Sequence, residues 1–184
     1  MEKPYVTEPD DRLSKAAWIR AMLQDYEQAL IRYTFGITGD LESARDVVQD
    51  AFLKLCRADR TKVRDRMPAW LYRVCRNRAF DVRKKEGRMQ PLHEEQLSRL
   101  PSQRPGPAAQ AEREESRRLV LAVLNELPVD QREACHLKFN DELTYREIGR
   151  VMGKSIGTVS SLLTGALNTI RKRLGAGLEP APEV

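Results

Sequence analysis

Long hydrophobic runs are absent from this sequence. The longest unbroken apolar stretch, Leu119–Leu124, is far shorter than the roughly 18 residues that suggest a membrane-spanning helix. The first residues also lack the basic and apolar segments of a secretory signal peptide. With 41% hydrophobic and 32% charged residues, the 184-residue chain is too hydrophobic for a disordered polymer and too charged for a membrane protein. We therefore expect a soluble, cytoplasmic protein without membrane insertion.

Cysteine and histidine are scarce as well. The three cysteines, Cys56, Cys75 and Cys135, are odd in number and far apart, which excludes a disulfide framework. Each lies among apolar helical positions, so we expect three small buried side chains. His136 is next to Cys135, but adjacent residues of a helix point about 100° apart and make a poor start for a metal site. With no phosphate loop and no catalytic triad in the sequence, we expect no enzyme, no metal and no cofactor.

The basic residues are concentrated in one segment. The formal net charge is +5, but residues 1–56 carry −3, residues 57–90 carry +8 and residues 91–184 are neutral. A local basic block of this kind indicates a polyanionic partner, while a solvated helical face is the alternative.

Strand patterns are nearly absent, whereas helical periodicity runs through the chain, which favours an all-α fold. In the first half, helices are predicted over 13–35, after an N-cap at Asp40, and over Ala69–Lys85 behind Pro68. An Arg- and Lys-rich loop, Arg57–Met67, is expected before the third helix. The second helix is expected to bury Leu41, Ala44, Val47, Val48, Ala51 and Leu55.

The helix predicted over Ala69–Lys85 has two different faces. One face is apolar and the other gathers four cations, one amide and one aromatic ring. These are the groups that contact phosphates, hydrogen-bond to base edges and stack on unpaired bases. The second face consists of Arg73, Arg76, Asn77, Phe80, Arg83 and Lys84.

The second half begins after a proline-rich stretch, 91–111, which is typical of a flexible linker. Helices are predicted over 116–127 and 129–139, followed by a helix-turn-helix pattern. In that pattern Thr144 and Glu147 form a capping box, Gly149 lies where the two helices touch, and Gly153 takes the left-handed turn position. An ordinary helical hairpin is the alternative.

Four stretches resemble one protein family in the right order. Asp40–Phe52, Ala69–Asp81, Leu127–Glu133 and Leu143–Gly149 are similar to segments of the extracytoplasmic-function group of sigma-70 family factors. The resemblance implies an all-α protein of two small helical domains. These are a sigma-2-like bundle over 12–90 and a sigma-4-like helix-turn-helix domain over 112–175, joined by the 91–111 linker and followed by a flexible tail, 176–184.

The resemblance also assigns surfaces to partners. Docking on the clamp coiled coil of bacterial RNA polymerase falls to Asp46, Gln49, Asp50 and Leu53. Reading and melting the −10 promoter element falls to Trp70, Arg73, Arg76, Asn77, Phe80, Arg83 and Lys84. Trp70 alternatively belongs to the core, and the docking residues alternatively form a solvated face. The polymerase flap is a further partner, an anti-sigma factor is allowed, and the free chain is expected to be a monomer.

The second domain departs from the family pattern. The helix that reads the −35 element is usually basic, whereas here its contacts fall to short hydroxyls and a few flanking cations. The candidate residues are Arg146, Ser155, Thr158, Ser160, Ser161, Thr164, Arg171 and Lys172. Three alternatives stay open: weak upstream binding, reading of shape more than of base edges, and partial exchange for a protein contact, for which Leu162 is expected to be exposed.

The function implied is a transcription initiation factor that brings core polymerase to promoters and opens them. The alternative is an operator-binding helix-turn-helix regulator that acts without polymerase. That alternative predicts a dimer and a basic recognition helix, and the sequence contains neither a dimer seam nor such a helix.

Overall fold

The computed structural model describes residues 11–85 and 120–174. All regular structure within these ranges is helical, and none of their helices is long and apolar enough to cross a membrane. The chain divides into two compact units, residues 1–83 and 84–184. The predicted linker 91–111 and tail 176–184 lie outside the described residues, so the predicted domain limits stay a prediction.

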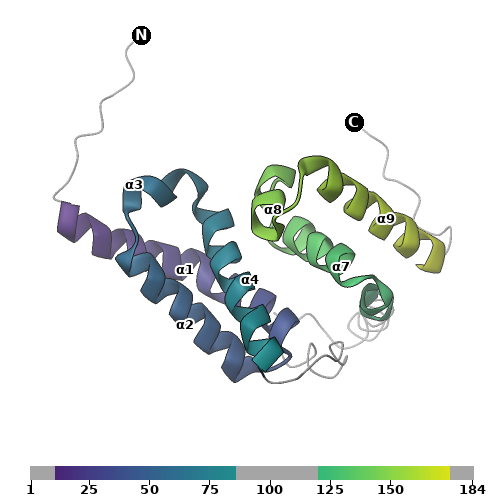
Figure 1. The fold of residues 1–184 in the computed structure, drawn as a ribbon, viewed down its shortest axis with the longest axis horizontal. Helices are drawn as coiled ribbons and strands as arrows, with labels where there is room; N and C mark the ends of the chain where they lie inside the picture. The colour runs from purple at the N-terminus through teal and green to yellow at the C-terminus, as the bar shows by residue number, and fades with distance from the viewer. Residues whose placement is uncertain (1–10, 86–119, 175–184) are drawn as a thin grey trace, which may run out of the picture. The chain divides into compact units, whose positions relative to one another are not determined.

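The first unit is built from three long helices, with two short helical segments between the second and the third (Figure 1). These are α1 (Asp11–Thr38), α2 (Leu41–Arg57), α3 (Arg60–Val63), the 3-10 turn η1 (Arg64–Arg66) and α4 (Met67–Lys85). Helix α1 packs along α2, and α4 joins α1 through two buried tyrosines. The ring centroids of Tyr33 and Tyr72 are 5.2 Å apart in an edge-to-face arrangement, the geometry that aromatic pairs prefer.

The junction between α1 and α2 is fixed by local hydrogen bonds. Helix α1 continues past Gly36 to Thr38, and Gly39 then turns the chain with a φ of 74°. The Asp40 carboxylate accepts a hydrogen bond of 2.8 Å from the backbone N–H of Ser43, which confirms the predicted N-cap. The buried Thr34 hydroxyl donates its proton mainly to the carbonyl oxygen of Leu30 in its own helix, at 2.7 Å, and lies 3.3 Å from the carbonyl oxygen of Ala44 on α2.

The buried face of α2 is close to the prediction. Ala44, Val47, Val48, Ala51 and Leu55 are buried, and Phe52 joins them. Leu41 is an error of the prediction, because it is 37% exposed. It occupies the first position of α2, where the side chain lies at the edge of the α1–α2 contact rather than inside it.

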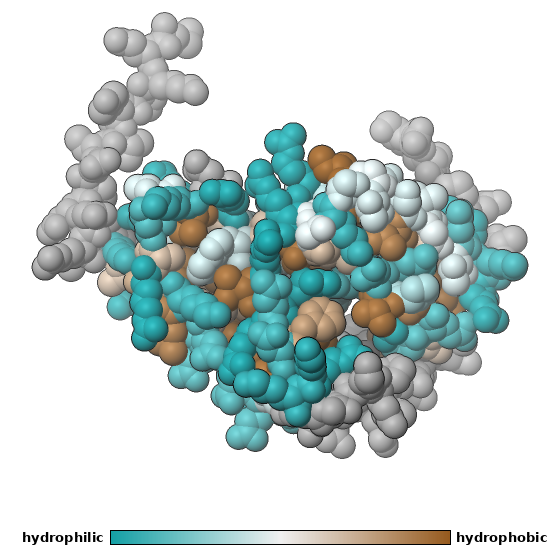
Figure 2. All heavy atoms as spheres, in the orientation of Figure 1, coloured by the Kyte–Doolittle hydropathy of each residue, from teal (hydrophilic) through white to brown (hydrophobic). Residues whose placement is uncertain are grey.

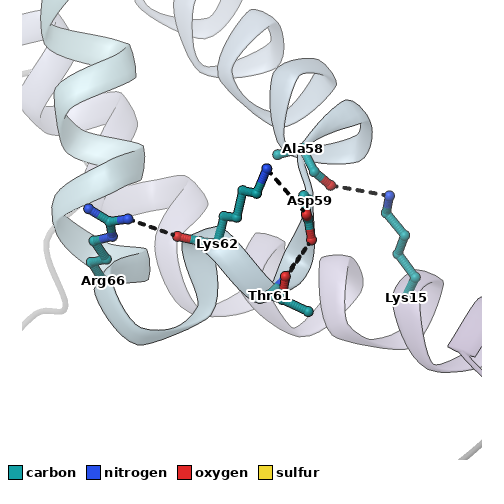
Figure 3. A network of polar contacts seen from close by, with 6 residues as sticks. All are labelled: Lys15, Ala58, Asp59, Thr61, Lys62 and Arg66. Atoms are coloured by element: carbon teal, nitrogen blue, oxygen red, sulfur yellow. Dashed lines mark hydrogen bonds and ion pairs between the residues drawn. The ribbon is translucent and has the colours of Figure 1, made fainter.

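The segment predicted as a loop, Arg57–Met67, is helical instead. Helix α2 runs through Arg57, and α3 and η1 fill the interval up to α4. Figure 3 shows what holds this segment: Asp59 caps α3, and the Lys15 ammonium on α1 donates to the carbonyl oxygen of Ala58 at 3.4 Å. Hydrogen bonds from Thr61 lower the pKa of the Asp59 carboxyl, so the cap is present above that group's usual pKa and is lost as the pH falls through the lowered value.

The described part of the second unit contains several short helical segments followed by one long helix. Residues 120–126 are helical and precede α7 (Val129–Cys135), the π-helical turn η2 (His136–Asn140), α8 (Tyr145–Met152) and α9 (Ile156–Leu174). Helix α9 packs on both α7 and α8. The single helix predicted over 129–139 is therefore α-helical only as far as Cys135, after which the hydrogen bonding widens to a π-turn.

The helix-turn-helix has the predicted local chemistry. Thr144 and Glu147 form the full capping box, and Gly153 is left-handed with a φ of 68°. Gly149 is where the helices touch: a Cβ there would lie 2.7 Å from the carbonyl oxygen of Lys154, too close for any other residue without movement. Val159 and Leu163 are buried, as expected for the residues that dock α9.

The cysteine prediction holds at two positions of three. Cys75 and Cys135 are buried, but Cys56 is exposed because it lies on the outer face of α2. Burial raises the pKa of the Cys75 thiol to about 12 and also raises the pKa of Cys135.

Candidate nucleic-acid interface

Helix α4 separates core from surface as its sequence indicates. Its buried side contains Leu71, Tyr72, Cys75 and Ala79. Of the seven candidate −10 residues, Arg73, Asn77 and Lys84 are exposed, whereas Trp70, Arg76, Phe80 and Arg83 are half-buried.

The aromatic ring on this face is held against a cation. The Arg76 guanidinium lies over the Phe80 ring, 4.7 Å from its centroid. The pair presents a flat, positively charged platform beside the exposed amide of Asn77. Such a platform can stack on a base while neighbouring cations neutralise phosphates.

The candidate docking residues lie on the outer face of α2. Asp46 and Gln49 are exposed and the Leu53 side chain is 50% exposed. Asp50 is different, because its carboxylate accepts a 3.0 Å hydrogen bond from Nε of Arg78. This ion pair connects α2 to α4 and gives Asp50 a positioning role that the sequence did not indicate.

The candidate residues of the second unit lie on α8 and along α9. Arg146, Thr158, Ser161, Thr164, Arg171 and Lys172 are exposed, and Ser160 is half-buried. Ser155 precedes α9 and its hydroxyl accepts the backbone N–H of Thr158 at 3.1 Å, the bond of a helix N-cap. Arg173 is held by Glu126 at 3.0 Å.

Two residues of α9 that sequence reasoning missed are also on its surface. Ile156 is 51% exposed, whereas Leu162, which was expected to be exposed, is half-buried. Asn168 is exposed and its side-chain oxygen accepts from Arg171 at 3.1 Å. Helical periodicity in the sequence could have placed Asn168 on this surface, because spacings of four and three residues put five positions on one face of the helix. These positions are Gly157, Ser161, Thr164, Asn168 and Arg171.

Lys154, in the turn between α8 and α9, has a structural partner. Its ammonium lies 2.9 Å from the carboxylate of Asp130 on α7. The turn is therefore attached to α7 by an ion pair.

The parts of the chain that the structure describes contain no cluster of His, Cys, Asp and Glu that could hold a metal ion.

An all-α unit with a basic, aromatic helix face, together with a capped helix-turn-helix, defines a nucleic-acid-binding protein. Sigma-70 region 2 matches residues 22–89, most of them in the first unit, and Sigma-70 region 4 matches residues 123–172, in the second.

Relatives of known class agree with both matches. The ECF RNA polymerase sigma factor EcfG of Rhodopseudomonas palustris is 31% identical over 80% of this chain and 78% of its own length. The ECF RNA polymerase sigma-E factor of Escherichia coli is 31% identical over 70% of this chain and 72% of its own. The chain belongs to the extracytoplasmic-function group of sigma-70 family factors.

A solved structure shares the fold. The sigma factor RpoE of Bartonella quintana, crystallised with the anti-sigma factor NepR, matches with a TM-score of 0.58 and 23% identity. The match covers 84% of this chain and 95% of that one. As a sigma factor, the protein directs RNA polymerase to promoters.

Proposed function

We propose that this sigma factor docks on the clamp coiled coil of core RNA polymerase through α2, reads and melts the −10 element with α4, and reads the −35 element with α9. The observation that carries the proposal is the surface of α4, where Arg76 lies over Phe80 at 4.7 Å with Asn77 exposed beside them. Opening a duplex requires surfaces that hold unpaired bases, and a cation-backed aromatic ring with an amide beside it supplies one.

The charge of the same helix supports the proposal. Arg73 and Lys84 are exposed on α4, and they lie within the segment that carries the +8 charge of residues 57–90. Cations placed there can hold the phosphates of the displaced strands after the bases unstack. An operator-binding regulator that reads duplex DNA would instead need its cations on the recognition helix.

Promoter opening tests this assignment. In reconstituted holoenzyme, Arg73→Ala and Lys84→Ala should each reduce the opening that permanganate footprints detect. Each should also make the dependence of log K on log salt shallower by about one unit. Asn77→Ala should reduce opening without changing the slope, because it removes a base contact and no charge.

The matched control is Arg32→Ala, which removes an exposed cation from α1 of the same unit. It should leave opening and the salt slope unchanged. If Arg32→Ala had the same effect as Arg73→Ala and Lys84→Ala, the effect would come from net charge in general and the assignment to α4 would be overturned.

Docking is tested on α2. Leu53→Ser should weaken core binding about tenfold if this exposed side chain is the apolar anchor of the contact. Gln49→Ala should weaken it less, and Glu42→Gln, on the exposed first turn of the same helix, should not. Unchanged affinity of Leu53→Ser in a pull-down would overturn the docking assignment.

The ion pair between Asp50 and Arg78 needs a separate comparison. If Asp50 contacts polymerase directly, Asp50→Ala weakens docking and Arg78→Ala does not. If the pair only positions α2 against α4, both variants weaken docking equally.

An anti-sigma factor is a further proposed partner. The solved relative from Bartonella quintana is in complex with one, the anti-sigma factor NepR. A protein that covers the exposed faces of α2 and α4 would block both proposed interfaces at once, and added core polymerase should compete with it for the chain.

A further inference from the structure

The first three turns of α9 present an exposed surface with no charged or amide side chain. From Ile156 to Leu167 the sequence contains only apolar residues, glycine, serine and threonine. Figure 2 shows the pale colour of such residues over α9, on a molecule whose viewed face is otherwise largely hydrophilic. Guanine is read in the major groove by Arg or Lys, and adenine by Asn or Gln. None of these side chains is available on this part of the helix.

Gly157 lies in the first turn of this surface, and nothing inside the chain requires a glycine there. A Cβ there would meet only the Ser155 hydroxyl oxygen, at 3.9 Å, an ordinary contact. Gly165 on the same helix is different, since its Cβ would lie 3.0 Å from the side-chain nitrogen of Gln131. Glycine within a helix is destabilising relative to alanine. On the exposed face of α9, the missing Cβ of Gly157 leaves room for close approach of something outside the chain.

The hydroxyl groups beside Gly157 are partly committed inside the helix. Ser161 donates its proton to the carbonyl oxygen of Gly157 at 3.1 Å, so its free lone pairs can only accept. The hydroxyls of Ser155 and Thr158 share one hydrogen bond of 2.8 Å. Ser161 is therefore poorly suited to guanine, whose major-groove edge offers acceptors alone, whereas Ser155 and Thr158 keep one free proton between them. The exposed side chains with apolar groups next to Gly157 are Ile156, 51% exposed, and Thr158.

We infer that this face of α9, made of Ile156, Gly157, Thr158 and Ser161, binds thymine methyl groups in the major groove of the upstream promoter element. The inference rests on the proposed function, in which α9 reads that element. Ile156 and the Thr158 methyl group supply the apolar contact, and Gly157 allows the helix backbone to approach the groove. Ser161 accepts a hydrogen bond from an exocyclic amino group of adenine or cytosine. Sequence preference then arises from methyl contacts, without the arginine–guanine pairs on which many recognition helices depend.

The test begins with selection by reconstituted holoenzyme from duplexes randomised upstream of a fixed −10 element. In the selected duplex, deoxyuridine in place of one contacted thymidine should weaken binding about fourfold, the effect of one buried methyl group. Replacing guanine by 7-deazaguanine should change affinity less than twofold. In the Ile156→Ser variant the deoxyuridine substitution should have no further effect, because the side chain that contacts the methyl group is gone.

Gly157→Ala separates folding from approach to DNA. It should raise the melting temperature of the second unit by about 2–8 °C, since the added Cβ meets open space, and should weaken binding of the selected duplex at least tenfold. The matched control is Gly36→Ala in α1, whose Cβ would likewise meet nothing within 4 Å. It should be equally harmless to folding and should leave DNA binding unchanged.

The two levels of the inference fail differently. If no upstream sequence is enriched, the −35 assignment of α9 fails and this inference with it. If a sequence is enriched but deoxyuridine has no effect, or if 7-deazaguanine has the larger effect, only the methyl reading is overturned. If Ile156→Ser weakens the binding of core polymerase and not of duplex DNA, the face belongs to a protein contact.

Discussion

The two units of this protein carry their polar chemistry in different places. In the first, the charged and aromatic groups lie on the outer face of α4, while α1 and α2 form a long packed pair behind it. In the second, the exposed face of the first three turns of α9 is neutral, and polar groups fix the local geometry of α8. Binding through cations is strong, long-ranged and sensitive to salt, whereas binding through methyl groups and close approach depends on shape. Under the proposed function, we expect the first unit to supply most of the electrostatic attraction to DNA and the second to supply register.

The units also differ in what defines their folds. The first is held by side chains that meet between long helices, such as the Tyr33–Tyr72 pair. The second relies on a turn in which Gly149 and Gly153 are constrained by the backbone itself. A substitution at either glycine should therefore lower the stability of the second unit alone.

The largest effect is expected in the reactivity of the three cysteines. The pKa of Cys75 is raised from 9.0 to about 12, which lowers its thiolate fraction about a thousandfold at pH 8 even before access is considered. The exposed Cys56 should react with a thiol reagent first, then Cys135, which is buried in the second unit and whose pKa is also raised. Cys75 should react only as fast as the first unit opens. Mass spectrometry of labelled peptides over time gives the order.

Mild urea should sharpen this comparison, because Cys75 and Cys135 report on different units. If the second unit opens at a lower concentration, Cys135 becomes reactive while Cys75 stays protected. Simultaneous loss of protection would mean that the two units unfold as one.

The second effect is expected at Gly149. A Cβ there would lie 2.7 Å from the backbone carbonyl of Lys154, so Gly149→Ala must displace the turn, at a cost of roughly 1–3 kcal/mol to the second unit. Both tryptophans, Trp18 and Trp70, lie in the first unit. The circular-dichroism transition of the second unit should therefore shift to lower urea while the tryptophan fluorescence transition stays in place. A fluorescence shift of equal size would show that the units are energetically coupled.

Features that depend on neighbours in the chain were predictable from the sequence. The N-cap at Asp40, the capping box of Thr144 with Glu147, and the left-handed Gly153 were all predicted, and each is present. Helix caps and turn residues depend on hydrogen bonds and backbone angles within about four residues, so their residue types can be recognised in the sequence itself. The division of α4 into a buried and a polar face followed from helical periodicity in the same way.

Features that depend on distant partners were not predictable. The Asp50–Arg78 ion pair joins residues of two helices. Helical periodicity predicts the face on which each residue lies, but not that the two side chains meet. The segment Arg57–Met67 was taken for a loop because it is rich in charge, yet contacts with α1 such as Lys15–Ala58 hold it helical. The exposure of Cys56 depends on which face of α2 packs against the rest of the unit, and Leu41 is exposed at the first position of that helix.

The smallest effect is expected at the two helix caps, which offer the most direct comparison between the units. Asp40→Ala removes the hydrogen bond to Ser43 N–H in the first unit, and Thr144→Ala removes the bond to Glu147 N–H in the second. Each should cost its own unit about 1 kcal/mol. Thr144→Ala should cost less, because Glu147 still accepts the backbone N–H of residue 144 at 2.8 Å. Only Asp40→Ala should move the tryptophan fluorescence transition, since both tryptophans belong to its unit. If each variant lowered the stability of its own unit by the same amount, the bond from the backbone N–H of residue 144 to Glu147 would contribute nothing to the stability of the helix-turn-helix.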